Sequence, residues 1–407
     1  MKTLKFGGSS LAGAKEFSLT ADATRKQKEV AAIVVSAGGK TDRQDKITDV
    51  LIKAYFSVKK GEDLYRAISP FYERLCGIKR ELRLKTDIDI LRMKIGRGFE
   101  KQPTLDFLVS RGEYCFAILV AEYLGYAFLD AGEVMKFDAD GKFNLEFSKF
   151  LIKDFYLKHG KFVCGGFYGS DGEGKIKLFG RGGSDFSGAV VAAALSTDYV
   201  NFTDVDGFYP IDPKICASVS PIERMGFNEA RIISEFGAGV LHPDSVLPLV
   251  GTGLTITVKN TFSPDLKGTV VCEDGEGEVS AVAKRNNCAY LELNGINEGY
   301  DLLKRLSEIK DLKSVALSVR ADKVSAVVSG SENLFALSSA GKFRNYTATD
   351  KVSLYYFARG EKSRSAYERA RKEVACLLAV DTRDGFYLAV REEDRDEVDK
   401  KVILAFS

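Results

Sequence analysis

Short apolar runs alternate with amphipathic stretches along the first two thirds of the chain. Thr3–Phe6 and Ala32–Val35 are apolar and β-branched and predict strands, while Lys46–Lys60 and Arg111–Leu124 have the spacing of amphipathic helices. Further runs predict buried strands, each before a glycine-rich or polar connection: Phe162–Cys164, Val200–Phe202 and Thr255–Lys259. This alternation predicts an α/β sheet, in which ligands bind at the carboxyl ends of the strands.

The pattern changes after the charged segment Glu273–Glu278, which interrupts the apolar periodicity. We place the main domain boundary there, with one domain over residues 1–275 and another over 276–407. Beyond it, the sequence predicts two small α+β lobes. The predicted elements are strands Tyr290–Leu293, Ser314–Val319, Val324–Val328, Val352–Phe357 and Gly385–Val390, and helices Tyr300–Ile309 and Arg364–Leu378.

Composition narrows the class of protein. The 59 basic and 57 acidic residues nearly cancel, so we expect no nucleic-acid partner, and any charged substrate must be held locally. No early apolar run approaches the length of a membrane span, and the first residues show no leader, so we expect neither export nor a membrane partner. Seven cysteines without a CxxC pair suit a reducing compartment, which we interpret as the cytoplasm. Only two histidines occur, which argues against a structural zinc site.

The segment Lys5–Ser10, KFGGSS, places a lysine at the end of a predicted strand, directly before two glycines. Glycines let backbone N–H groups approach an anion, so the segment can form a phosphate cradle. It matches neither the Walker A loop nor the GxGxxG fingerprint. By itself, the segment also fits a simple strand-to-helix turn.

Two later segments carry similar chemistry. Gly180–Asp185, GRGGSD, opens a predicted helix that runs through Gly188–Leu195, so helix N–H groups and a cationic arginine face whatever binds there. Asp185 could either cap this helix or orient a catalytic lysine. The aspartates, aromatic residues and lysine of Phe202–Lys214 could hold adenine and phosphates, or form only a proline- and aspartate-rich turn.

These three segments occur in the order and spacing of aspartokinases of the amino-acid kinase superfamily, which the chain resembles from its start to about Val271. KFGGSS is similar to the family's KFGGTS. The Arg-Gly-Glu element separates aspartokinases from acetylglutamate, glutamate and uridylate kinases. Further similar segments are Val35–Gly38 with Thr48 downstream, Ser110–Glu113, Gly166–Gly169, TDVDGFYPIDP and Phe236–Pro243.

The resemblance implies the amino-acid kinase fold, a mainly parallel sheet flanked by helices, followed by two ACT-like lobes. It implies transfer of a phosphoryl group from Mg²⁺-bound ATP to the β-carboxylate of L-aspartate, the entry step to lysine, threonine and methionine synthesis. Lys5 and Asp185 would be catalytic. The implied substrate-binding residues are Ser36, Thr48, Glu113, Phe167, Arg181 and Ser184, and the implied ATP-binding residues are Lys5, Gly7, Gly8, Ser9, Thr203, Asp204, Tyr209 and Lys214.

In this assignment, Glu113 binds the ammonium of aspartate and Arg181 its α-carboxylate. Without the resemblance, a glutamate in a predicted helix would be interpreted as a solvated charge. We name no metal-binding residue, because Mg²⁺ with a nucleotide is typically held through phosphates and water. No general base is needed, since the β-carboxylate is ionised at neutral pH.

The chain departs from the family pattern in two places. Gly239 stands where many aspartokinases have the lysine of FGAKVLHP, and we expect Lys214 to compensate. The effector signature of the ACT-like lobes is weak, because Lys313, Arg320 and Lys323 stand where the family is polar but uncharged. We therefore expect little feedback inhibition by lysine or threonine, and lobes that serve as a homodimer surface. The alternatives are a related kinase with another acidic substrate and a non-catalytic amino-acid sensor.

Overall fold

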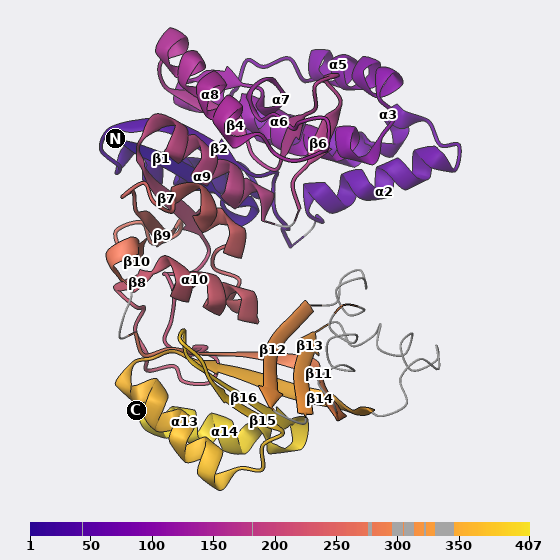
Figure 1. The fold of residues 1–407 in the computed structure, drawn as a ribbon. Coiled ribbons are helices and arrows are strands. Elements are labelled where there is room, and N and C mark those ends of the chain that lie inside the picture. The colour runs from indigo at the N-terminus through magenta and orange to yellow at the C-terminus, as the bar shows by residue number, and fades with distance from the viewer. Residues whose placement is uncertain are drawn as a thin grey trace. The chain divides into compact units, whose positions relative to one another are not determined.

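The structure is a computed structural model that describes residues 1–42, 44–180, 182–275, 279–294, 304, 313–320, 323–329 and 346–407. The chain forms two compact units (Figure 1). The first contains Met1–Phe208, Glu223–Arg231 and Gly239–Gly275, and the second contains Tyr209–Ile222, Ile232–Ala238 and Glu276–Ser407. The second unit thus includes two short segments from the predicted first domain, and the domain division at residues 275 and 276 stays a prediction.

An eight-stranded sheet forms the centre of the first unit, in the order β3-β4-β2-β1-β7-β9-β10-β8. Every pairing from β3 to β9 is parallel, β10 is antiparallel to β9, and β8 is parallel to β10. The strands are β1 (Lys2–Phe6), β2 (Val30–Val35), β3 (Ala127–Leu129), β4 (Phe162–Gly165), β7 (Asp198–Thr203), β8 (Arg224–Gly226), β9 (Ile256–Asn260) and β10 (Thr269–Cys272). A separate antiparallel pair joins β5 (Tyr168–Ser170) and β6 (Ile176–Leu178).

Helices cover both faces of this sheet. The helices of the first unit's part of the chain are α1 (Ala14–Arg25), α2 (Ile47–Lys59), α3 (Leu64–Ala67), α4 (Ser69–Leu82), α5 (Ile88–Lys101), α6 (Leu105–Leu124), α7 (Ala131–Val134), α8 (Leu145–His159), α9 (Gly183–Leu195) and α10 (Phe227–Ile233). On one face, Leu4 and Phe6 of β1 pack in a core with Phe116 of α6. On the other, Val34 of β2 packs in a core with Val190 of α9. Because both faces are covered, all six residues of β2 are buried.

Most predicted elements of the first unit are confirmed, but the start of one helix was wrong. The predicted helix Arg111–Leu124 begins six residues earlier, at Leu105, because Thr104 Oγ1 accepts the N–H of Phe107 at 3.2 Å and caps it there. The Arg-Gly-Glu element therefore lies within a long buried helix. The helix predicted to follow GRGGSD is α9, which begins at Gly183.

The second unit contains a six-stranded antiparallel sheet in the order β12-β13-β11-β14-β16-β15. Tyr355 of β14 packs in one core with Tyr367 of α13 and Val402 of α14. The elements are β11 (Val282–Asn294), β12 (Lys313–Arg320), β13 (Lys323–Ser329), β14 (Tyr346–Phe357), α13 (Glu361–Glu373), β15 (Leu378–Asp381), β16 (Phe386–Arg391) and α14 (Arg395–Phe406). Together, the two sheets confirm the predicted fold class.

The five strands predicted for this region all correspond to observed strands, although β16 begins one residue after the predicted Gly385, whereas β15 and α14 were not predicted. The helix predicted to end at Leu378 ends at Glu373, because Val374 has an extended backbone. The predicted helix Tyr300–Ile309 lies outside the described residues, apart from Lys304. In the part of the chain that the structure describes, no helix is both long and apolar enough to cross a membrane.

Candidate active site

The loops that follow four neighbouring parallel strands, β4, β2, β1 and β7, meet at the carboxyl edge of the large sheet. This edge is where open α/β sheets bind ligands. Backbone hydrogen bonds join the loops: Gly7 N donates to Phe202 O (3.2 Å), Ser36 N to Phe6 O (3.1 Å), Gly39 N to Gly8 O (2.7 Å) and Gly166 N to Val35 O (2.9 Å). Candidate residues from distant parts of the sequence are thereby brought to one place.

Lys5 and Asp185 form an ion pair at this edge. Lys5 Nζ lies 2.6 Å from Asp185 Oδ1, and the two side chains are only 9% and 15% exposed. The other oxygen, Asp185 Oδ2, accepts the backbone N–H of His242 at 3.0 Å. The helix cap is Gly182, with no side-chain cap hydrogen bond. Asp185 therefore does not cap α9 and instead holds the lysine of β1.

The glycine-rich loop after β1 lies directly against the loop after β2. A Cβ placed on Gly8 would lie 2.9 Å from the carbonyl oxygen of Ala37, so a larger residue would push these loops apart. A Cβ on Gly7 would lie 3.4 Å from Lys5 Nζ. Ser9 is half-buried in the 3₁₀ turn Gly8–Leu11. The loop thus presents backbone, rather than side chains, beside the lysine, as a phosphate cradle requires.

Glu113 is the third charged residue of the site, and it is 4% exposed. Its Oε1 accepts the backbone N–H of Ala37 at 3.1 Å, whereas its Oε2 is buried and has no hydrogen-bond partner among the described residues. Burial raises the pKa of Glu113 to about 7, and the Ala37 N–H and the nearby Arg111 guanidinium oppose this rise. Glu113 is therefore a buried carboxylate with room for one more donor.

Other predicted substrate residues lie on segments that adjoin Glu113. A Cβ on Gly166 would lie 2.8 Å from the Cα of Ser184, so the loop after β4 touches the start of α9. Phe167 in that loop has φ of 75°, and its N–H donates to Ser187 Oγ at 3.1 Å. Ser36 directly precedes Ala37, which binds Glu113. A Cβ on Gly165 would lie 3.1 Å from the carbonyl oxygen of Glu113, so the end of β4 adjoins this residue. Ser36, Phe167 and Ser184 thus lie on neighbouring segments at this edge of the sheet.

Two substrate residues are less well defined. Thr48 is half-buried in the first turn of α2, and that turn is tied to the loop after β2 because Ile47 N donates to Gly38 O at 3.0 Å. Thr48 therefore adjoins the same loop as Ser36. Arg181 lies outside the described residues, so its predicted contact with a carboxylate stays a prediction.

The predicted nucleotide residues fall into two groups. Thr203 and Asp204 follow β7 in the first unit, where Thr203 Oγ1 donates to Asp204 Oδ1 at 3.3 Å. Tyr209 and Lys214 belong to the second unit, where Lys214 is exposed and its backbone N–H donates to Asp212 Oδ1 at 2.9 Å. Thr203 and Asp204 therefore follow β7 at the carboxyl edge of the sheet in the first unit, while the ATP contacts of Tyr209 and Lys214 stay predictions.

Two residues of the site were not predicted. His242 holds Asp185 through its backbone, and its ring covers Gly182, where φ is 74° and a Cβ would lie 2.0 Å from the ring. Asn201 of β7 is fully buried in register with Lys5, and neither its Oδ1 nor its Nδ2 has a partner among the described residues. The signal for Asn201 was a polar residue within an apolar run. A backbone contact such as that of His242 leaves no such signal.

The position that departs from the family pattern, Gly239, has φ of 64°. A lysine would be strained there, so the glycine suits the local backbone. The end of β9 also reaches the glycine-rich loop, because Thr261 Oγ1 and Ser10 Oγ share a 2.6 Å hydrogen bond. Among the described residues, no group of three or more His, Cys, Asp or Glu side chains is arranged to hold a metal ion.

Comparison with known proteins agrees with this geometry. Residues 2–260 match the model of the amino acid kinase family. The chain is 32% identical to aspartokinase 3 of Bacillus subtilis over 70% of this chain and 64% of that protein, and 31% identical to lysine-sensitive aspartokinase 3 of Escherichia coli over 72% and 69%. The chain therefore belongs to the amino acid kinase family, and these relatives within it are aspartokinases.

Solved structures give the same result. The aspartate kinase of Clostridium acetobutylicum is 27% identical and superposes over 100% of both chains with a TM-score of 0.89. Aspartokinase III of E. coli, solved with aspartate and ADP, has a TM-score of 0.78 at 22% identity over 100% of this chain and 99% of that chain, a likeness of fold. The matched region spans less than two thirds of the B. subtilis relative and of the Chlamydia pneumoniae aspartokinase, at 64% and 62% of their lengths.

Proposed function

We propose that the protein is an aspartate kinase that converts ATP and L-aspartate to ADP and 4-phospho-L-aspartate. The observation that carries this proposal is the placement of two buried charges at one sheet edge. Lys5 is held by Asp185 beside a glycine-rich loop, and Glu113 has a carboxylate oxygen without a donor. A phosphoryl group and an amino-acid ammonium are the partners that these two charges suit.

Glu113 Oε2 would accept a proton of the substrate ammonium. A cation at that oxygen would favour the ionised carboxylate, which burial otherwise disfavours. Arg181 would bind the α-carboxylate through its planar fork. Ser36, Thr48, Phe167 and Ser184 would complete the pocket, which leaves the β-carboxylate as the free nucleophile.

Lys5 would stabilise the charge on the transferring phosphoryl group, and Asp185 would keep its ammonium in position. Gly7, Gly8 and Ser9 would cradle the phosphates, while Thr203, Asp204, Tyr209 and Lys214 would contact the remainder of ATP. A Mg²⁺ ion bound with the nucleotide would supply positive charge that offsets the charge of the phosphates. The β-carboxylate attacks without a general base, because its usual pKa lies near 3.9.

The proposal includes a homodimer formed through the second unit. The strand β12 lies at the end of the six-stranded sheet, and Leu317 and Val319 on it are 41% and 56% exposed. An edge strand with exposed apolar side chains is suited to pairing with another copy. A cytoplasmic location is also part of the proposal, and the free thiols of all seven cysteines accord with a reducing compartment.

A hydroxamate trap for acyl phosphates tests the reaction. The purified protein is incubated with Mg-ATP and L-aspartate, L-glutamate or N-acetyl-L-glutamate. Product with L-aspartate alone is expected. N-acetyl-L-glutamate lacks the free ammonium that Glu113 would bind, and the additional methylene of L-glutamate would displace its side-chain carboxylate from the phosphoryl group. Product only with one of the other two substrates would favour a related kinase, and no product with any of them would favour an amino-acid sensor. Both results would contradict the proposal.

A further inference from the structure

A buried arginine of α4 binds two loops of the active site through three backbone carbonyl groups. Phe71, Leu75 and Ile78 form the buried stripe of α4, and Arg74 lies on the same stripe, where helical spacing favours an apolar residue. The Arg74 residue is 4% exposed. A charged side chain at such a position needs a specific set of partners.

Those partners are backbone carbonyl groups. Arg74 Nε and Nη2 both donate to the carbonyl oxygen of Ala12, at 3.1 and 2.5 Å. Nη2 also donates to the carbonyl oxygen of Gly39, and Nη1 donates to that of Asp45 at 2.9 Å. No carboxylate among the described residues forms an ion pair with Arg74. Burial lowers the pKa of its guanidinium, and Glu16 opposes this effect.

The three carbonyl groups belong to the three segments that build the site. Ala12 ends the glycine-rich loop that begins at Gly7, and Gly39 lies three residues after Ser36 in the loop after β2. Asp45 lies two residues before α2, whose first turn carries Thr48. A single rigid guanidinium therefore fixes the distances between the phosphate loop, the loop after β2 and the start of α2.

We propose that Arg74 is a positioning residue that holds the phosphate loop and the substrate loop in register for phosphoryl transfer. The proposal rests on the proposed kinase function. Arg74 acts through backbone carbonyls on the two loops whose N–H groups and side chains would bind the substrates. Because hydrogen bonds from a charged donor are strong and directional, the loss of this guanidinium releases all three segments together.

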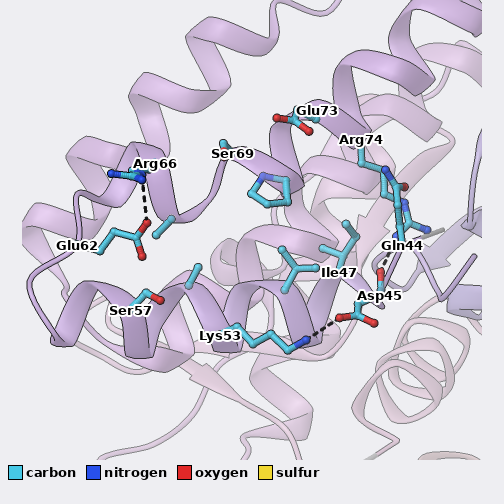
Figure 2. Close-up of a pocket in the computed structure, with 14 residues that line it drawn as sticks. Gln44, Asp45, Ile47, Lys53, Ser57, Glu62, Arg66, Ser69, Glu73 and Arg74 are labelled. Carbon is cyan, nitrogen blue, oxygen red and sulfur yellow. Dashed lines mark hydrogen bonds and ion pairs between the residues drawn. The ribbon is translucent and has the colours of Figure 1, made fainter.

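The surroundings of Arg74 offer a way to test this role. Arg74 lies at one end of an open cavity of about 670 Å³ bounded by α2, α3 and α4, and Arg66 and Glu62 lie at the other end (Figure 2). Truncation of Arg74 would therefore leave a space that a small guanidinium ion can enter from solvent. Arg66 lines the same cavity, but it is 83% exposed and pairs only loosely with Glu62, at 3.7 Å.

The experiment compares Arg74→Ala, Arg74→Lys and the control Arg66→Ala. For each variant, turnover, KM for both substrates, Mg-ADP binding by calorimetry and the melting temperature are measured. We expect Arg74→Ala to lower kcat/KM for both substrates roughly 10- to 100-fold, the scale of a small misplacement of reacting groups. We also expect weaker Mg-ADP binding. Millimolar methylguanidinium should restore part of both losses, whereas methylammonium should not.

Arg74→Lys keeps the charge but lacks the fork, so it should fold and remain well below wild-type activity. Arg66→Ala should match the wild type. Wild-type Mg-ADP binding in a folded Arg74→Ala variant would overturn the proposal, as would a loss that methylguanidinium does not restore. If Arg74→Ala fails to fold, Arg74→Lys decides, and full activity in that variant would overturn the proposal. Failure of the wild type to phosphorylate aspartate would reject the kinase function, while Mg-ADP binding would still report on Arg74.

Discussion

Two charged residues of the site, Lys5 and Glu113, are both buried, but their charges are compensated in different ways. Lys5 has a carboxylate in place, with Asp185 at 2.6 Å. Glu113 has one backbone N–H at 3.1 Å and a second oxygen without a partner. The positive charge is therefore neutralised within the protein, whereas the negative charge is left for a ligand to neutralise.

This difference separates a catalytic role from a binding role. A lysine that stabilises a transition state must be oriented before the reaction starts, since preorganisation is the source of its effect. A carboxylate that binds an ammonium must instead keep one oxygen available. The cost of that availability is the raised pKa of Glu113, which burial brings to about 7.

The substitution with the largest expected effect removes the charge of Lys5. We expect Lys5→Ala to lower turnover roughly 10²- to 10³-fold with an unchanged circular dichroism spectrum, because one preorganised electrostatic contact is lost. Lys2→Ala is the matched control, since Lys2 lies on the same strand and donates to Gln27 Oε1 at 2.9 Å at the other end. Turnover close to that of the control would remove Lys5 from the mechanism.

Removal of the Glu113 carboxylate should change different kinetic constants. We expect Glu113→Ala to raise KM for aspartate roughly 10- to 100-fold, because a charged hydrogen-bond partner of the ammonium is lost. KM for ATP should change little. Steady-state kinetics with each substrate varied in turn measures both effects. An equal loss for aspartate and ATP would contradict the assignment of Glu113 to the amino acid.

The pair Lys5 and Asp185 shows how much of the site could be predicted from the sequence. The strands and the first turn of α9 follow from apolar runs and glycine spacing, so Lys5 and Asp185 could each be placed at an element end. That Asp185 holds Lys5, rather than capping its own helix, depends on how α9 packs on β1. No local pattern reports that packing, and the resemblance to aspartokinases supplied it.

The burial of Glu113 and Arg74 was harder to predict. Both are charged residues on helices, and charged residues are usually exposed. Only the tertiary structure shows that backbone carbonyl groups bind Arg74 and that Glu113 accepts one backbone N–H. The helix α14 was missed for a related reason. Its first seven residues contain one apolar side chain, Val398, and its last five, Val402–Phe406, are all apolar, so no helical period is visible in the sequence.

The pH dependence of aspartate capture sharpens the comparison further. Because the pKa of Glu113 in the free protein is raised to about 7, the carboxyl is protonated below that pH and cannot accept the ammonium. We expect kcat/KM for aspartate to fall about tenfold per unit as the pH drops below 7, and to level off above it. The measurement is a pH profile from about 5.5 to 8.5, which covers roughly one to two units on either side of 7. Glu113→Gln should abolish this break, and an unchanged break would assign it to another group.

Asn201, beside Lys5, gives a smaller effect on stability. Its two buried polar atoms have no described partner, so Asn201→Leu should raise the free energy of unfolding by about 1–2 kcal/mol. The matched control is Thr3→Val, which removes a buried hydroxyl that is paired with Thr197 Oγ1 at 2.7 Å and should lower stability. Urea denaturation measures both. If Asn201→Leu were destabilising and also lowered turnover, Asn201 would instead be a partner of Lys5.

The smallest expected effect is inhibition by lysine or threonine through the second unit. The same comparison of paired and unpaired carboxylates predicts that this inhibition is weak. An effector shifts an enzyme between two states only by its difference in affinity for them, so it needs groups that bind its ammonium and carboxylate. Glu292 of β11 is a carboxylate suited to an ammonium, but Lys323 Nζ lies 2.6 Å from its Oε2, and Tyr290 donates to the same oxygen at 2.5 Å. Like Asp185, Glu292 is already neutralised within the protein, and nothing resembling the unpartnered oxygen of Glu113 is seen in the described part of this unit.

We therefore expect initial rates at subsaturating aspartate to fall by less than about half with millimolar lysine, threonine or both. Stronger inhibition would mean that the effector binds elsewhere or displaces Lys323, and Glu292→Gln would distinguish these cases, because it weakens inhibition only if the effector takes the place of Lys323.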